Sequence, residues 1–130
     1  MAEMSNYLEN ALLNATLNAT TYTAPATVYV SLWTSDPTDA GSGTEVSTSG
    51  TGYARTAVTF GAPSNGVTTN SADVTFPTAT ASWGTVGWIG INDALTSGNL
   101  LYHSPLDTAK AIDTGDIFKI SSGNLSVTLA

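Results

Sequence analysis

A change in hydrophobic period at Thr27 constrains the fold of this chain most strongly. Residues 6–18 contain neither Gly nor Pro, which is typical of a helix. Beyond Thr27 the period becomes two, as in a half-buried strand: Val28, Val30 and Leu32 alternate with Tyr29, Ser31 and Trp33. Similar short segments follow, separated by turn residues at intervals of about ten residues. This pattern predicts a mainly β protein, an antiparallel β-sandwich or jelly-roll-like barrel of seven to eight short strands with one N-terminal helix.

The same pattern sets the expected organisation of the chain. We expect one domain over residues 1–130, with residues 1–20 as an N-terminal helical arm and residues 27–130 as the β body. The expected strands are Thr27–Thr34, Tyr53–Phe60, Ala72–Phe76, Thr85–Ile91, Leu100–Leu106, Ile117–Ile120 and Leu125–Leu129. Thr38 to Gly52 is rich in Gly, Ser and Thr and has no apolar period. For a loop of this length we expect either mobility or ordering by a partner.

The helical segment carries apolar residues on two opposed faces. Asn6 and Glu9 have the spacing of a capping box, which predicts the start of the helix. At 100° per residue, Leu8, Leu12 and Ala15 share one face, Leu13 and Leu17 lie nearly opposite, and Asn10, Asn14 and Asn18 form a polar ladder between them. Two interpretations follow for Leu13 and Leu17: a loop of the same chain covers them, or the helix lies between its own body and a neighbouring subunit.

Charge narrows the classes of partner. Charged residues make up only 10% of the chain, and 3 Lys and Arg face 10 Asp and Glu, giving a net charge of -7. Binding to nucleic acid needs clustered cations, and an anionic membrane surface would repel this chain. We therefore expect neither partner. Neutral Ser, Thr and Asn side chains are cheaper to desolvate than ions, which favours packing in an assembly, although exposed Thr on strands would give the same composition.

No motif for catalysis or cofactor binding is found. His103 is the single histidine and lies within an expected strand, so a hydrogen-bonded structural histidine is predicted. Asp36 and Asp39 lack the spacing of a calcium loop, and there is no cysteine to ligate zinc or act as a nucleophile. We predict no catalytic residue, no metal site, no cofactor and no enzymatic activity.

Aromatic residues provide one further candidate site. A sugar-stacking platform could be built from Trp33, Trp83, Trp88, Tyr53 and Tyr102. Trp88 lies in the most apolar segment, which favours the core. Trp33 lies on the strand face opposite to Val30 and Leu32, so it is expected to be exposed or at an interface.

Several stretches together resemble a family of short virion structural proteins of tailed bacteriophages, commonly labelled tail fibre proteins. The resemblance covers nearly the whole chain, and its stretches are Asn6–Leu13, Val28–Pro37, Gly52–Phe60, Val74–Pro77, Trp83–Val86 with Ile89–Ile91, and Gly98–Leu106. It implies a non-enzymatic component of the virion, assembled in the host cytoplasm. The family has no catalytic motif to carry over.

Two places in the virion are then possible. A chain of this size has no heptads and no collagen-like repeat for a fibre shaft. We therefore expect a capsid decoration (cement) protein that stabilises the head shell, with a tail fibre or tail adapter as the alternative, and a glycan-binding module as a weaker one. The expected partners are the major capsid protein or tail proteins, and further copies of the chain. The expected interface residues are Leu13, Leu17, Asn10, Asn14, Trp33, Thr38 and Glu45.

Overall fold

The computed structural model describes residues 2–129 as one helix and nine strands. Helix α1 spans Asn6–Leu17. The strands are β1 Glu3–Met4, β2 Val28–Trp33, β3 Thr56–Val58, β4 Val67–Thr69, β5 Val74–Thr75, β6 Gly84–Asn92, β7 Leu100–Ile112, β8 Lys119–Ile120 and β9 Ser126–Thr128. The expectation of a mainly β fold with one N-terminal helix is confirmed.

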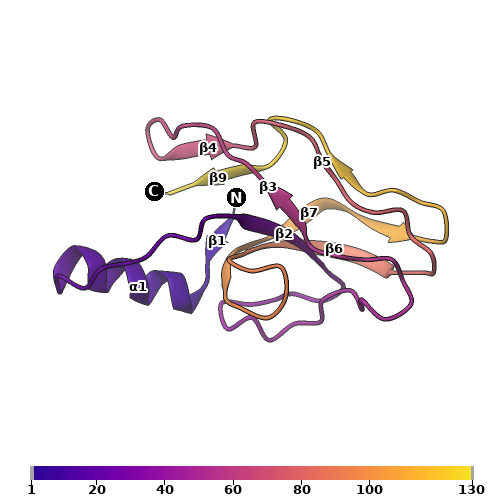
Figure 1. Ribbon diagram of the computed structural model, residues 1–130, viewed down its shortest axis with the longest axis horizontal. Coiled ribbons are helices and arrows are strands. Elements are labelled where there is room, and N and C mark those ends of the chain that lie inside the picture. Colours follow the sequence, from indigo (N-terminus) through magenta and orange to yellow (C-terminus); the bar gives the residue numbers. More distant parts are fainter. Residues whose placement is uncertain (1, 130) are drawn as a thin grey trace.

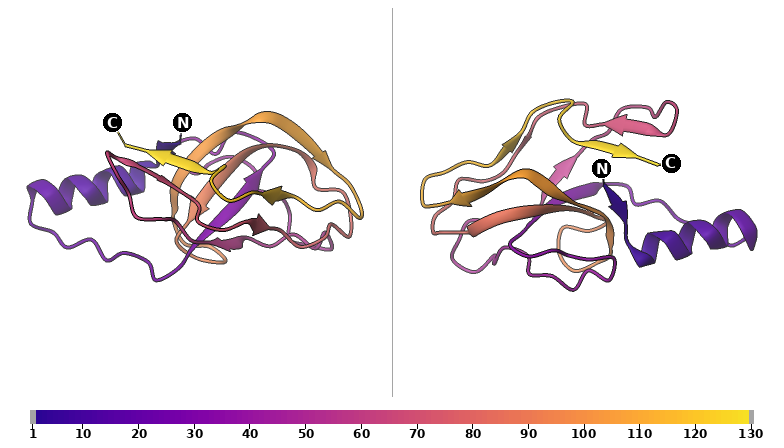
Figure 2. Two further views of the ribbon diagram at one scale, coloured as in Figure 1. Left: turned by 90° about the horizontal axis from the view of Figure 1, so that it is seen from above. Right: turned by 180° about the vertical axis from the view of Figure 1, so that it is seen from behind.

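The strands form two layers (Figure 1). The larger layer is a five-stranded antiparallel sheet in the order β1-β7-β6-β2-β3. Two antiparallel ribbons, β4–β9 and β5–β8, lie across one face of it (Figure 2). The two layers face one another as in a sandwich, and the strands do not close into a barrel.

The main core fills the space between the sheet and the ribbons. The inner face of the sheet, which we define as the face toward the ribbons, contributes the alternating residues Val30, Leu32, Ile89 and Ile91. The ribbons and their connections contribute Val74, Phe76, Phe118, Leu125 and Val127. Phe76 also packs edge-on against Phe118, with 5.6 Å between ring centroids. The alternation in the sequence of β2 therefore predicted its core-facing residues, Val30 and Leu32, correctly.

The opposite face of the sheet, here called the outer face, is covered by loops. Residues 34–45 fold back beneath β2, and the turn between β6 and β7 lies beside them (Figure 1). Thr34 N–H donates to the carbonyl of Thr44 and Val46 N–H donates to that of Leu32, both at 2.9 Å. Gly43 makes the close turn possible, because a Cβ there would lie 2.3 Å from the Asp36 carbonyl oxygen. Hydrogen bonds within the chain thus order the first part of the Thr38–Gly52 loop, where we expected mobility or an ordering partner.

Several element boundaries differ from the expected ones. The N-cap is Ser5, not Asn6: the Ser5 hydroxyl accepts a hydrogen bond from Leu8 N–H at 3.2 Å. Strands β1 and β4 were not predicted, because neither lies in one of the segments for which a strand was expected. Strand β7 continues to Ile112, well past Leu106. Pro105 is tolerated inside it because its neighbour β6 has a register shift between Val86 and Trp88.

Helix α1 projects from the body of the molecule (Figures 1 and 2). Only its beginning lies against the sheet, where Leu8 is buried. The chain then returns along the helix through residues 18–27 to begin β2. Within residues 2–129, no helix is both long and apolar enough to cross a membrane.

Candidate functional site

The root of the arm is fixed to strand β7. Ser5 is 2% exposed; its N–H donates to the Leu101 carbonyl at 2.8 Å and its hydroxyl donates to the Leu100 carbonyl. Loop 34–45 adds a second contact, because Asn6 N–H donates to the carbonyl of Asp39 at 2.9 Å. The helix therefore leaves the body in a defined direction.

Beyond its first turn, the arm presents apolar side chains to solvent. Leu13 is 54% and Leu17 75% exposed. Of the two interpretations of the second apolar face, coverage by a loop of the same chain is wrong, since no described segment buries these leucines. A shallow apolar groove beside them is lined by Met4, Glu9, Leu12, Leu13 and Thr16.

The polar ladder of the helix is present as expected. Asn10 and Asn14 are both exposed. The Asn18 side-chain amide donates to Asn14 Oδ1 at 3.0 Å, and Thr16 donates to the Leu12 carbonyl at 2.8 Å. Four of the expected interface residues, Leu13, Leu17, Asn10 and Asn14, therefore lie on one accessible helix.

Trp33 is not exposed, contrary to the expectation from its strand position. Its side chain is buried on the outer face, with 6% of the residue exposed. The indole N–H donates to Ser31 Oγ at 2.8 Å, and Ser31 donates to Asn92 Oδ1 at 2.6 Å. Loop 34–45 and the β6–β7 turn cover this face. The residues of β2 that alternate with the core residues, Ser31 and Trp33, are therefore buried as well.

The aromatic residues do not gather into one exposed platform. Tyr53 and Trp83 lie in the main core in an edge-to-face pair, with ring centroids 5.4 Å apart. Trp88 pairs with Trp33 across β6 and β2 and is only partly buried, so the expectation that Trp88 belongs to the core is wrong. Of the two partners, Trp33 takes the buried position, where its indole N–H is bonded to Ser31.

Glu45 lies in a hydrogen-bonded cluster at the edge of the sheet. Its carboxylate receives Arg55 Nη2 at 2.8 Å and Nε at 2.9 Å, and the Tyr53 hydroxyl at 2.6 Å. The hydrogen bond to Glu45 raises the pKa of Arg55. Burial, followed by the hydrogen bond to Glu45, raises the pKa of Tyr53. The carboxylate of Glu45 is thus engaged within the chain, and its predicted interface role stays a prediction.

Thr38 occupies an exposed turn of loop 34–45. Its φ is +58°, and Asp36 Oδ1 accepts its backbone N–H at 2.9 Å. The Thr38 and Ser42 hydroxyls are 3.0 Å apart. Thr38 therefore remains accessible, next to the residues that hold the arm.

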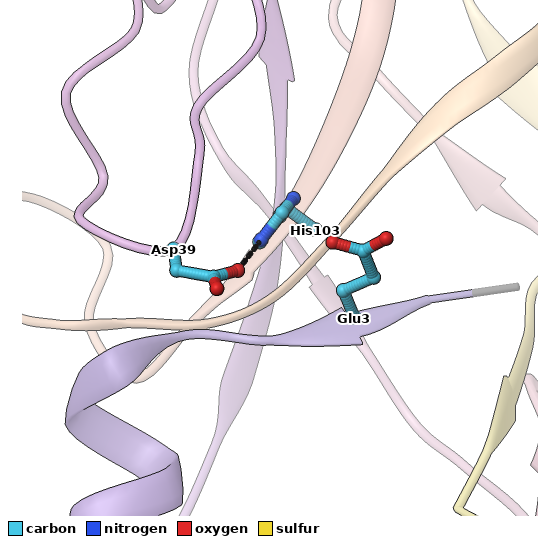
Figure 3. Close-up of side chains that lie close together, drawn as sticks. All are labelled: Glu3, Asp39 and His103. Atoms are coloured by element: carbon cyan, nitrogen blue, oxygen red, sulfur yellow. Dashed lines mark hydrogen bonds and ion pairs between the residues drawn. The ribbon is translucent and has the colours of Figure 1, made fainter.

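His103 lies between two acidic side chains on the outer face (Figure 3). It is 6% exposed, and its Nε2 is 2.8 Å from Asp39 Oδ1, so the expectation of a hydrogen-bonded strand histidine is confirmed. Glu3 is its register partner on β1. One ligand atom from each of these three residues lies within 4.8 Å of the others.

The sequence did not predict that these three residues meet. Asp39 and His103 are 64 positions apart, and the two-residue strand β1 gave no periodic signal that would place Glu3. The one usable indication was the Asp36-Pro-Thr-Asp39 segment. Read by itself, this segment predicts only a loop, whereas the partner of Asp39 comes from a distant strand.

Comparison with protein families shows which family nearly the whole chain matches. A family model described as Podophage GP4 fiber I protein gp80 matches residues 3–128. The chain belongs to this family. The fiber I family is a family of phage virion structural proteins, so the resemblance that the sequence suggested is confirmed and the virion is the location of the protein. No curated protein matches the chain significantly.

Proposed function

We propose that this protein is a small, non-enzymatic structural subunit of a podophage tail fibre. The family description names a fibre, which supports the tail alternative better than the head decoration that we expected from the sequence. The same description gives no support to a cement role. The described residues form one helix and nine strands in two layers, which suits a compact unit of the fibre that is joined to neighbours.

The observation that carries this proposal is the uncovered apolar face of the arm. A helix of about 12 residues is marginal by itself and depends on packing, yet the outer half of α1 has Leu13 and Leu17 largely exposed. Burying each leucine against a partner would contribute about 1.5–3 kcal/mol. Asn10 and Asn14 beside them supply neutral donors and acceptors suited to an interface rim.

The proposed partners are other tail proteins and further copies of the chain. Assembly of repeated copies strengthens weak identical contacts through avidity. The net charge of -7 argues against nucleic acid and anionic membranes as partners. We place this assembly in the host cytoplasm, where the structural proteins of the particle meet before release.

A double substitution on the arm tests its role. Leu13→Asp with Leu17→Asp should leave a folded protein, because neither side chain is in the core, but one that no longer joins particles. Circular dichroism reports folding, and mass spectrometry of purified particles reports incorporation.

The matched control places the same charges on the body. Leu95 is 51% and Ile117 55% exposed, so Leu95→Asp with Ile117→Asp should be incorporated like the wild type. Normal incorporation of the arm variant, or its unfolding, would contradict the proposal.

The number of copies in each particle separates the tail from the head. A tail fibre follows the low rotational symmetry of the tail and needs tens of copies or fewer, whereas a shell decoration needs hundreds. Quantitative mass spectrometry of purified virions measures this number. Hundreds of copies would restore the cement interpretation.

A further inference from the structure

We propose that Glu3, Asp39 and His103 bind one divalent transition-metal cation, which locks the root of the helical arm to the body. The three residues come from β1, loop 34–45 and β7. This inference goes beyond the proposed fibre role and does not depend on it.

The spacing of the side chains is close to that of a metal site. Zinc binds imidazole nitrogen and carboxylate oxygen at about 2.0–2.2 Å, so neighbouring ligand atoms on one ion lie about 3 Å apart. His103 Nε2 and Asp39 Oδ1 are already 2.8 Å apart. All three ligand atoms lie within 4.8 Å of one another, and the exposed Glu3 side chain can close the remaining gap by rotating. The ion would replace the hydrogen bond between His103 and Asp39.

The local charge also favours a cation. Asp36 Oδ1 lies 4.0 Å from His103 Nδ1, so three carboxylates surround one imidazole. Cationic side chains that form ion pairs in the described part of the chain do so elsewhere: Arg55 binds Glu45 at 2.8 Å and Lys119 binds Asp73 at 3.2 Å. A divalent ion would offset this negative charge. Asp36 faces the second ring nitrogen from beyond hydrogen-bond distance and adds to the negative charge around the imidazole.

The donor set indicates the class of metal. One imidazole with two carboxylates suits zinc and neighbouring transition metals better than magnesium or calcium, which prefer oxygen alone. Three protein ligands leave a coordination position for water. The buried ring of His103 forms the inner wall, while the side chain of Asp39 is 46% exposed, so an ion can enter from solvent.

Binding would connect the three segments that position the arm. The Asp39 carbonyl already accepts the N–H of Asn6, the first helical residue. An ion on the Asp39 carboxylate would hold this residue from its other side. Because the unfolded chain cannot present the three ligands together, binding would stabilise the folded state.

Titration of the full-length chain tests the site. Protein freed of metal with EDTA is titrated with zinc chloride by isothermal calorimetry, and its thermal unfolding is followed with and without zinc. We expect one zinc per chain and a higher unfolding temperature. Glu3→Gln and Asp39→Asn should each weaken binding at least about tenfold, while circular dichroism shows an unchanged fold for the exposed Glu3→Gln variant.

The control is Glu9→Gln, the same substitution on the same arm outside the cluster, which should bind zinc like the wild type. Absence of stoichiometric binding, or a loss in Glu3→Gln no larger than in Glu9→Gln, would overturn the proposal. Magnesium chloride binding as tightly as zinc would also overturn it, because His103 would then not be a ligand. These measurements use the isolated chain, so their outcome is independent of incorporation into particles.

Discussion

The inner and outer faces of the five-stranded sheet are both buried, but by different means. The inner face packs Val30, Leu32, Ile89 and Ile91 against the two ribbons. The outer face carries Ser31 and Trp33 and is covered by loops rather than strands. A polar face can be buried at low cost only when its donors and acceptors find partners.

The outer face meets this condition. Ser31 links Asn92 and the Trp33 indole through two hydrogen bonds, and His103 pairs with Asp39. Within residues 2–129, no buried side-chain nitrogen or oxygen lacks a partner. The inner face therefore contributes hydrophobic burial, and the outer face contributes specific positions for the loops and the arm.

The largest effect is expected from a cavity on the inner face. Leu32 is 0% exposed, so Leu32→Ala should lower the free energy of unfolding by about 2–5 kcal/mol through lost burial and an unfilled cavity. Urea denaturation measures this change. Leu95→Ala, on an exposed leucine, should cost less than about 0.5 kcal/mol. Equal losses in the two variants would argue against the inner face as the main core.

A smaller effect is expected when one hydroxyl is removed from the outer face. Ser31→Ala leaves the Trp33 indole N–H and Asn92 Oδ1 without their partner in a buried site, which should cost about 1–3 kcal/mol. The exposed Ser126→Ala serves as control, and the same denaturation experiment applies. A loss indistinguishable from that of the control would show that the outer face does not depend on this network.

The smallest effect concerns Tyr53, which joins the core to the edge of the sheet. Its ring packs in the core, and its hydroxyl donates to Glu45 and accepts Leu32 N–H at 3.0 Å. Burial, then Glu45, raises its pKa in the folded state above the unfolded value of about 10. Below pH 10 the Tyr53 hydroxyl is protonated in both states and the stability does not depend on its ionisation. Above pH 10 it ionises more readily in the unfolded chain, so the free energy of unfolding should fall by about 1.4 kcal/mol for each pH unit.

Unfolding in urea at pH 9 and pH 11 measures this slope. Tyr53→Phe has a lower stability at pH 9 but should lose less between the two pH values, because it has one ionising hydroxyl fewer. Burial also raises the pKa of Tyr102, so part of the slope should remain in the variant. Identical slopes in both proteins would exclude Tyr53 as a contributor.

Much of the fold follows from local pattern. The alternation of Val28, Val30 and Leu32 identified the inner face, and the Gly- and Pro-free segment identified the helix. What could not be predicted is the fate of the alternate residues on the same strand. A period of two separates the faces of a strand but does not show which distant loop covers the second face, so the pattern predicts that Trp33 is exposed or at an interface.

The candidate site also has one part that local sequence predicts and one part that depends on distant contacts. That Leu13 and Leu17 share a face opposite Leu8 could be predicted because a helical wheel is a local property of the chain, whereas their exposure is known only from the structure. The meeting of Glu3, Asp39 and His103 depends on strand pairing between β1 and β7 and on the path of a Gly-rich loop. Such contacts join residues distant in sequence, and a single sequence does not specify them.

Asp39 couples the position of the arm to that of loop 34–45. Asp39 binds Asn6 N–H through its carbonyl and His103 through its carboxylate, so the loop cannot swing away without releasing the first turn of the helix. In hydrogen exchange the amides of that turn and of residues 34–45 should therefore open together, as one cooperative unit. Arm orientation is then a property of the loop as much as of the helix. Variation in the loop would re-aim the arm without altering the surface that it presents.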